Sequence, residues 1–143
     1  MADPTCVFCR IIAGEVPAHF VIDQGDVLAF LDARPLFPGH TLVVPREHVV
    51  TLPELAPERV EPVFATVRRV AAAVVAGLDA DGSFVALNNV VSQSVPHLHV
   101  HVVPRRRKDG LRGFFWPRTR YADEAEAEAV AARIREALDP ADG

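Results

Sequence analysis

Three histidines alternate with apolar residues in segment 97–103, which reads His-Leu-His-Val-His-Val-Val. Successive side chains of a β-strand point to opposite faces, so this spacing predicts a strand with His97, His99 and His101 on one face. Imidazole titrates close to neutral pH and serves as a nucleophile, a general acid or base, or a metal ligand. A polar strand that faces solvent is the alternative interpretation. Half of the six histidines lie within five residues, which favours a functional site.

The order of the predicted elements indicates an α+β fold. Periodicity and turn residues predict a short helix or turn at 6–13, strands at 20–22, 27–31 and 41–44, a long helix within 53–77, strands at 84–88 and 97–103, and a helix at 122–138. Pro62 is unfavourable inside the long helix and could mark its start, whereas Gly77 suits a C-terminal cap. This order contains no repeating βαβ unit, so we expect a mostly antiparallel sheet.

The composition argues against several classes of function. The 143 residues suffice for one domain with a core, and the net charge of −4 disfavours binding to long nucleic acids. No apolar stretch approaches the roughly 20 residues of a membrane span, and the N-terminus lacks the basic and apolar run of a signal peptide. We therefore expect a cytoplasmic protein that binds neither membranes nor polynucleotides.

The two cysteines form a Cys6-x-x-Cys9 motif. This pair could be a redox couple, half of a zinc site or two buried thiols. A redox couple of this type usually follows a strand, and only five residues precede Cys6. A closed zinc site requires two further ligands. The cysteines by themselves leave the three alternatives open.

The segment 93–105, QSVPHLHVHVVPR, resembles the signature of the histidine triad (HIT) family of nucleotide hydrolases and transferases. Segments 6–17 (CVFCRIIAGEVP), 28–32 (LAFLD) and 38–45 (PGHTLVVP) resemble further parts of the family, and the resemblance thins after about residue 107. It implies a five-stranded antiparallel sheet with two helices, continued across a homodimer. It also implies one HIT domain over residues 1–143, with 105–143 as its tail.

The resemblance implies a chemistry as well. The middle histidine of the family attacks the α-phosphorus of a nucleotide, usually adenylyl, and water hydrolyses the nucleotidyl-histidine. By position His99 is the nucleophile, His101 binds the phosphate or protonates the leaving group, and His40 supports them. Asp32 would bind the ribose hydroxyls, with a strand-end cap as the alternative. The remaining residues implied at the phosphate are Asn88 or Asn89, Gln93 and Ser94.

The stretch 88–93 departs from the family pattern. It is about two residues shorter than the usual glycine-rich loop, and Ser92 replaces the glycine before Gln93. A loop without glycine allows less close approach of its backbone to a phosphate, so the substrate preference becomes the open question. Candidates for the base pocket, again by resemblance, are Phe8, Ile11 and Leu31.

A zinc-containing, Hint-like bacterial branch of the family carries structural zinc at positions that correspond here to Cys6, Cys9, His48 and His97. Two thiolates and two neutral imidazoles suit Zn²⁺, and four protein ligands leave no open position for catalysis. Two reduced thiols without metal are the alternative. In this interpretation His97 is structural, whereas His99 and His101 carry the chemistry.

Two features and two functions stay open. The run Arg105–Lys108 is either a solvated turn or a cluster of cations that attracts a polyphosphate. The aromatic residues 114–116 suit a core or dimer contact, with a base-stacking lid as the alternative. A dinucleoside polyphosphate hydrolase or phosphorylase is the alternative activity, and a noncatalytic nucleotide-binding or interaction protein is the alternative class.

Overall fold

The computed structural model describes residues 2–111 and 118–138. The chain divides into two compact units, residues 1–109 and 110–143, and the histidine segment lies in the first. Among the described residues, no helix is long and apolar enough to cross a membrane. The aromatic residues 114–116 lie outside the described residues.

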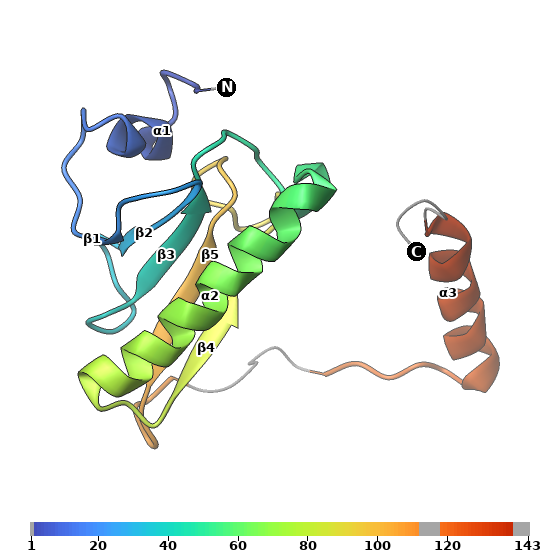
Figure 1. Ribbon diagram of the computed structural model, residues 1–143. Coiled ribbons are helices and arrows are strands. Elements are labelled where there is room, and N and C mark those ends of the chain that lie inside the picture. The colour runs from blue at the N-terminus through green and yellow to red at the C-terminus, as the bar shows by residue number, and fades with distance from the viewer. Residues whose placement is uncertain (1, 112–117, 139–143) are drawn as a thin grey trace. The chain divides into compact units, whose positions relative to one another are not determined.

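Five strands form one sheet in the first unit, in the order β1-β2-β3-β5-β4 (Figure 1). All neighbouring pairs are antiparallel, which confirms the predicted α+β class and the five-stranded HIT-like sheet. The strand bounds are β1 Phe20–Ile22, β2 Val27–Leu31, β3 Thr41–Pro45, β4 Gly82–Ala86 and β5 Val100–Arg105.

Helix α2, Pro57–Leu78, packs across one face of this sheet (Figure 1). Its valines at spacings of three and four are buried against strand residues of that face, which explains the periodicity of the sequence. The helix tolerates Pro62 in its second turn, so Pro62 does not mark its start. The helix also ends later than predicted, because Asp79 (φ 54°) and not Gly77 takes the left-handed position after the last turn.

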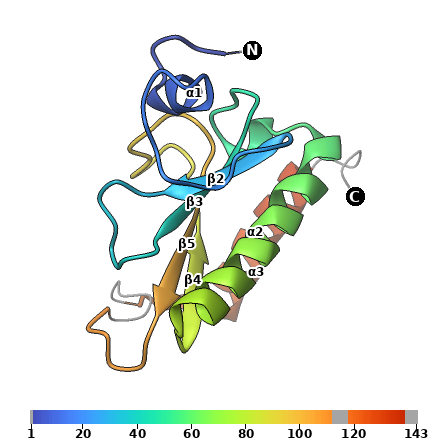
Figure 2. The same ribbon diagram turned by 60° about the vertical axis from the view of Figure 1, so that its left-hand side comes forward.

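The short helix α1, Val7–Ile12, packs on β2 and β3 away from α2 (Figure 2). Residues of these strands alternate between the two faces: Ala29 and Val43 face α2, whereas Phe30 and Leu42 belong to the cluster around α1. The sheet thus has a buried core on one side and, on the other, a smaller apolar cluster that holds α1.

The histidine segment runs into β5 but does not lie wholly within it. The strand begins at Val100 and ends at Arg105, so the prediction of 97–103 is displaced. Leu98 pairs outside the sheet, because its N–H donates to the Val49 carbonyl at 2.7 Å. Leu98 nevertheless packs with Val100 in the core under α2, so the predicted alternation holds through the extended segment.

The second unit contains helix α3, Glu124–Ala137, within the predicted range 122–138. Asp123 caps its N-terminus, since its side chain accepts a hydrogen bond from the Glu126 N–H at 2.8 Å. Acidic residues in the first turn and Arg135 in the last turn match the helix dipole.

Candidate active site and metal centre

His99 is buried and held by a backbone carbonyl. Its Nδ1 lies 2.7 Å from the His97 carbonyl oxygen, which can only accept, so Nδ1 carries the proton. The lone pair of a neutral His99 is therefore on Nε2. Burial lowers the pKa of His99 below its ordinary value, although the bond to His97 and the Asp32 carboxylate act in the opposite direction. His99 therefore combines a neutral ring with a defined tautomer.

A second chain of hydrogen bonds fixes His40 and His101. The Leu36 N–H donates to His40 Nδ1 at 3.1 Å, so the proton of a neutral His40 is on Nε2. That Nε2 lies 2.9 Å from His101 Nδ1, which must then accept, and the proton of His101 is on its Nε2. Burial lowers the pKa of His40 and lowers that of His101 to about 4. The site therefore contains the Nε2 lone pair of His99 beside the Nε2–H donor of His101.

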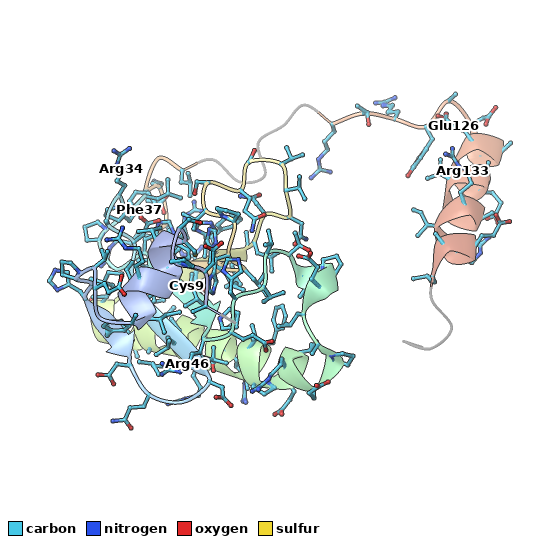
Figure 3. The ribbon with its side chains drawn as sticks, turned by 90° about the horizontal axis from the view of Figure 1, so that it is seen from above. Cys9, Arg34, Phe37, Arg46, Glu126 and Arg133 are labelled. Carbon is cyan, nitrogen blue, oxygen red and sulfur yellow. The ribbon has the colours of Figure 1, made fainter. Side chains whose placement is uncertain are left out.

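Asp32 follows β2 at the edge of this cluster. Its Oδ1 accepts from the Arg34 N–H at 2.8 Å, and its Oδ2 lies 3.7 Å from His40 Nε2. The Arg34 side chain extends outward from the loop (Figure 3), and the Arg34 backbone N–H is the group that donates to Asp32. Asp32 thus caps the strand end, as the alternative interpretation has it, and also keeps one oxygen beside the histidines.

A cavity of about 750 Å³ joins these groups to an apolar pocket. Asp32, Ser94, His99 and His101 line one part of it, and the ring of Phe8 stands edge-on to His99 with centroids 5.1 Å apart. Ile11 and Leu31, which were predicted for the base pocket together with Phe8, also line the cavity. Sequence reasoning missed several lining residues: Val7, Val16, Pro17, Ala18, His19, Phe30, Leu42 and Val95.

The short loop before Ser94 is braced by its own side chains. Gln93 accepts from the Val90 N–H at 3.0 Å and donates to the Val50 carbonyl at 2.6 Å, while Asn89 accepts from the Leu52 N–H at 2.8 Å. Of the residues predicted at the phosphate from this stretch, only Ser94 lines the cavity. Asn88 is exposed, and its amide donates to the Ser92 carbonyl at 3.3 Å. Both asparagines therefore bond within the protein, Asn89 to the Leu52 N–H and Asn88 to the Ser92 carbonyl, and neither lines the cavity.

Ser92 and Val90 take the backbone conformation that glycine favours. Their φ angles are 63° and 69°, in the left-handed region. This conformation, which glycine adopts readily, costs about 1 kcal/mol or more per residue at Val90 and Ser92. The bonds of Gln93 stabilise this turn against that cost.

A second cluster consists of four possible metal ligands that form a compact cage: Cys6, Cys9, His48 and His97. The two Nδ1 atoms lie 3.3 Å apart, and the sulfur-to-nitrogen distances range from 3.3 to 3.6 Å. A tetrahedral zinc ion, with bonds of about 2.0 Å to nitrogen and 2.3 Å to sulfur, separates its ligands by about 3.3–3.8 Å. The four atoms therefore match a zinc coordination shell, and Cys9 brings its sulfur from α1 (Figure 3).

The protonation of the cage also suits a cation. His97 Nε2 lies 2.9 Å from the Pro45 carbonyl, so its proton is there and Nδ1 presents a lone pair to the cage. Burial lowers the pKa of His97 to about 4, which keeps the ring neutral. Burial raises the pKa of the Cys6 thiol, and a bound dication would offset this by stabilising the thiolate.

Two arginines of the basic run 105–108, at the end of β5, form hydrogen bonds with nearby groups of the protein. Arg105 forms two hydrogen bonds with the Asp109 carboxylate, at 2.6 and 3.0 Å. The Arg106 guanidinium donates to the carbonyls of Leu78 and Asp79 at the C-terminal end of α2. These contacts favour the structural interpretation for both arginines.

Comparison with known proteins places this geometry in a family. The HIT domain profile matches residues 13–108. An uncharacterised HIT-like protein of Mycobacterium tuberculosis is 41% identical, over 93% of this chain and 92% of its own. The adenosine 5′-monophosphoramidase of Schizosaccharomyces pombe is 30% identical over 92% of this chain and 99% of its own. An adenylylsulfatase of Arabidopsis thaliana is 35% identical over 74% of this chain and 55% of its own.

Solved structures share the fold. A HIT family protein from Bacillus subtilis aligns with a TM-score of 0.86 at 32% identity, over 94% of this chain and 98% of that chain. A zinc-bound histidine triad protein from Mycobacterium smegmatis aligns with a TM-score of 0.71 at 38% identity, over the same shares of the two chains. The domain match, the relatives and the shared fold show that this chain belongs to the histidine triad (HIT) family, in its bacterial HIT-like branch.

Proposed function

We propose that this protein is a nucleotide hydrolase or transferase in which His99 forms a covalent bond to the α-phosphorus of its substrate, most simply an adenylyl compound. One observation carries the proposal: the His97 carbonyl holds the Nδ1 proton of His99, which leaves the Nε2 lone pair for a substrate in the cavity. An imidazole that is neutral at pH 7 is a competent nucleophile toward phosphorus. Two relatives with nucleotide-cleaving activities support the same reaction class.

The reaction has two steps on these residues. His99 Nε2 attacks the phosphorus and a P–N bond forms. The bond to the leaving group breaks and that group takes its proton from solvent, while the His101 Nε2–H donates a hydrogen bond to a phosphate oxygen. The substituted His99 ring carries a positive charge, which the His97 carbonyl stabilises through the Nδ1 proton. Water then attacks the phosphorus, the P–N bond to His99 breaks, and the surplus proton of the water passes to solvent. The nucleoside monophosphate leaves, and His99 is again neutral.

The remaining groups suit the rest of a nucleotide. The Asp32 carboxylate can accept from the two ribose hydroxyls, and Ser94 can donate to the phosphate. The apolar part of the cavity, around Phe8 and Ile11, suits the planar base. We favour an adenosine phosphoramidate as the substrate, with a dinucleoside polyphosphate as the second candidate.

We further propose that the cage of Cys6, Cys9, His48 and His97 holds a structural Zn²⁺. The distances and proton positions support this assignment, and the relative from Mycobacterium smegmatis is zinc-bound. When bound, zinc would join α1 to the segment before β5 and keep both cysteines as thiolates. Such thiolates persist in a reducing compartment, which supports the expectation of a cytoplasmic location.

A homodimer is the assembly that we infer for this domain. Strand β4 is an edge of the sheet, and Val85 in that strand is 42% exposed. Val60 and Phe64 on α2 are also exposed apolar residues. Pairing of two β4 strands would continue the sheet across the dimer and cover its open edge. Light scattering during gel filtration measures the mass and tests this inference directly.

Trapping the covalent intermediate tests the activity. Wild-type protein is mixed with α-³²P-labelled adenosine phosphoramidate, quenched in alkali, and analysed for an acid-labile, alkali-stable label. We expect the label on His99, its complete loss in His99→Ala, and slowed labelling in His101→Ala. A dinucleoside tetraphosphate in parallel, with and without phosphate, separates hydrolase from phosphorylase activity. Tight AMP binding without any labelled histidine would identify a noncatalytic binding protein instead.

A further inference from the structure

Asp3 contacts the cage from the N-terminal side. Its backbone N–H donates to Cys9 Sγ at 3.4 Å, and its carbonyl accepts from the Cys6 N–H at 3.1 Å. Its carboxylate Oδ2 lies 3.9 Å from His48 Nε2. One residue thus touches three of the four residues that form the cage, and it lies ahead of the HIT domain match.

The side chain of Asp3 is held in the orientation that faces His48. Its Oδ1 accepts from the Thr5 N–H at 2.8 Å and from the Thr5 hydroxyl at 2.7 Å. Pro4 follows directly, and a proline restricts the residue before it to extended conformations. Both constraints leave Oδ2 as the oxygen directed at the imidazole.

His48 presents its two nitrogens to different partners. Its Nδ1 lies 3.3 Å from both Cys9 Sγ and His97 Nδ1, inside the cage. In a neutral ring that ligates through Nδ1, the proton is on Nε2, on the side of Asp3. At 3.9 Å the Asp3 carboxylate is not hydrogen-bonded to this nitrogen, but its negative charge attracts the outer N–H, which favours this ring orientation and makes His48 a more basic ligand. The Asp3 N–H, in turn, stabilises negative charge on the Cys9 sulfur.

We propose that Asp3 is the outer-sphere carboxylate of the metal centre: a positioning residue that orients His48 and strengthens zinc binding without coordinating the ion. This role rests on the proposed zinc site. It extends the centre beyond its four ligands to an N-terminal segment that contains no part of the histidine triad.

Asp3→Asn tests the role of the charge. Asparagine can still accept from Thr5 through its carbonyl, so the turn is kept while the charge is lost. Asp23→Asn is the matched control, because Asp23 is an exposed carboxylate in the turn between β1 and β2. Zinc affinity is measured on the full chain by competition with a chromophoric chelator, and coordination is read from the absorption bands of the Co²⁺-substituted protein.

We expect Asp3→Asn to bind zinc about 10- to 100-fold more weakly than wild type, with unchanged tetrahedral Co²⁺ bands and with Asp23→Asn equal to wild type. Equal affinities of Asp3→Asn and wild type would overturn the role of Asp3, as would an equal loss in Asp23→Asn. Altered Co²⁺ bands in Asp3→Asn would show that Asp3 is itself a ligand. Failure of the wild type to bind zinc or cobalt would instead overturn the zinc site.

Discussion

His97 and His99 are coupled through a single hydrogen bond: the carbonyl oxygen of His97 lies 2.7 Å from Nδ1 of His99. The side chain of the same His97 contributes Nδ1 to the Cys2His2 cage and directs Nε2 to the Pro45 carbonyl. A metal that fixes the His97 ring therefore also fixes the group that sets the tautomer of the nucleophile. The proposed zinc ligand and the proposed nucleophile are therefore linked through one residue, His97.

Zinc removal should therefore disturb His99 as well as the cage. We expect the metal-free protein to unfold at a lower temperature, because binding to the native state stabilises it. We also expect the ¹⁵N resonances of His99 to move from a defined tautomer toward the exchange average of the two. Re-addition of zinc should restore both properties. An unchanged His99 spectrum in protein shown to be free of metal would contradict this coupling.

His40 should act on turnover by orienting His101. His40→Ala removes the donor to His101 Nδ1, so the proton of His101 is no longer directed to Nε2. We expect kcat to fall by about 100-fold, as for other losses of an oriented hydrogen-bond donor to the reacting phosphate. His40→Gln offers a replacement N–H donor and should recover part of the activity. Circular dichroism of both variants checks the fold, and equal activities of the two would argue against this role.

Acid should destabilise the protein through His101. The pKa of His101 is about 4 in the folded state and 6.5 ordinarily, so between these values the unfolded chain binds more protons. The contribution of His101 to the free energy of unfolding is therefore fully present above pH 6.5. At most about 3 kcal/mol of it is lost as the pH falls toward 4. Urea unfolding of wild type and His101→Gln across this range measures the effect. The difference in the free energy of unfolding between the two proteins should shrink as the pH falls. A difference that stays constant with pH would contradict the assignment to His101.

Gly39 should be hard to replace. Its φ is +99°, and an added Cβ would lie 2.2 Å from Leu78 Cδ1 and 3.3 Å from Pro104 Cγ. Leu78 can move, but the backbone conformation remains unfavourable for alanine. We expect Gly39→Ala to lower the free energy of unfolding by about 1–2 kcal/mol and to shift the adjacent His40. Gly25→Ala, also at positive φ but with open space around its Cβ, separates the steric part from the backbone part.

Much of the fold follows from the sequence. The alternation in segment 97–103 predicts which side chains are buried, and Leu98 and Val100 are in the core as expected. The valines of α2 show the period of a helix that covers a sheet. The ends of these elements were less predictable, because tertiary contacts set them: Leu98 pairs with Val49 and not with a strand, so β5 starts late.

The sequence by itself determined the family, the sheet and the residue types available for chemistry, because periodicity and motif spacing are local properties of the chain. Only the tertiary structure decided which nitrogen of each histidine carries the proton. The proton positions on His40 and His99 depend on backbone groups of Leu36 and His97, which are close in the chain, whereas that on His97 depends on the carbonyl of Pro45 in β3, 52 positions away. The reach of Asp3 to His48, across 45 positions of sequence, likewise exists only after folding.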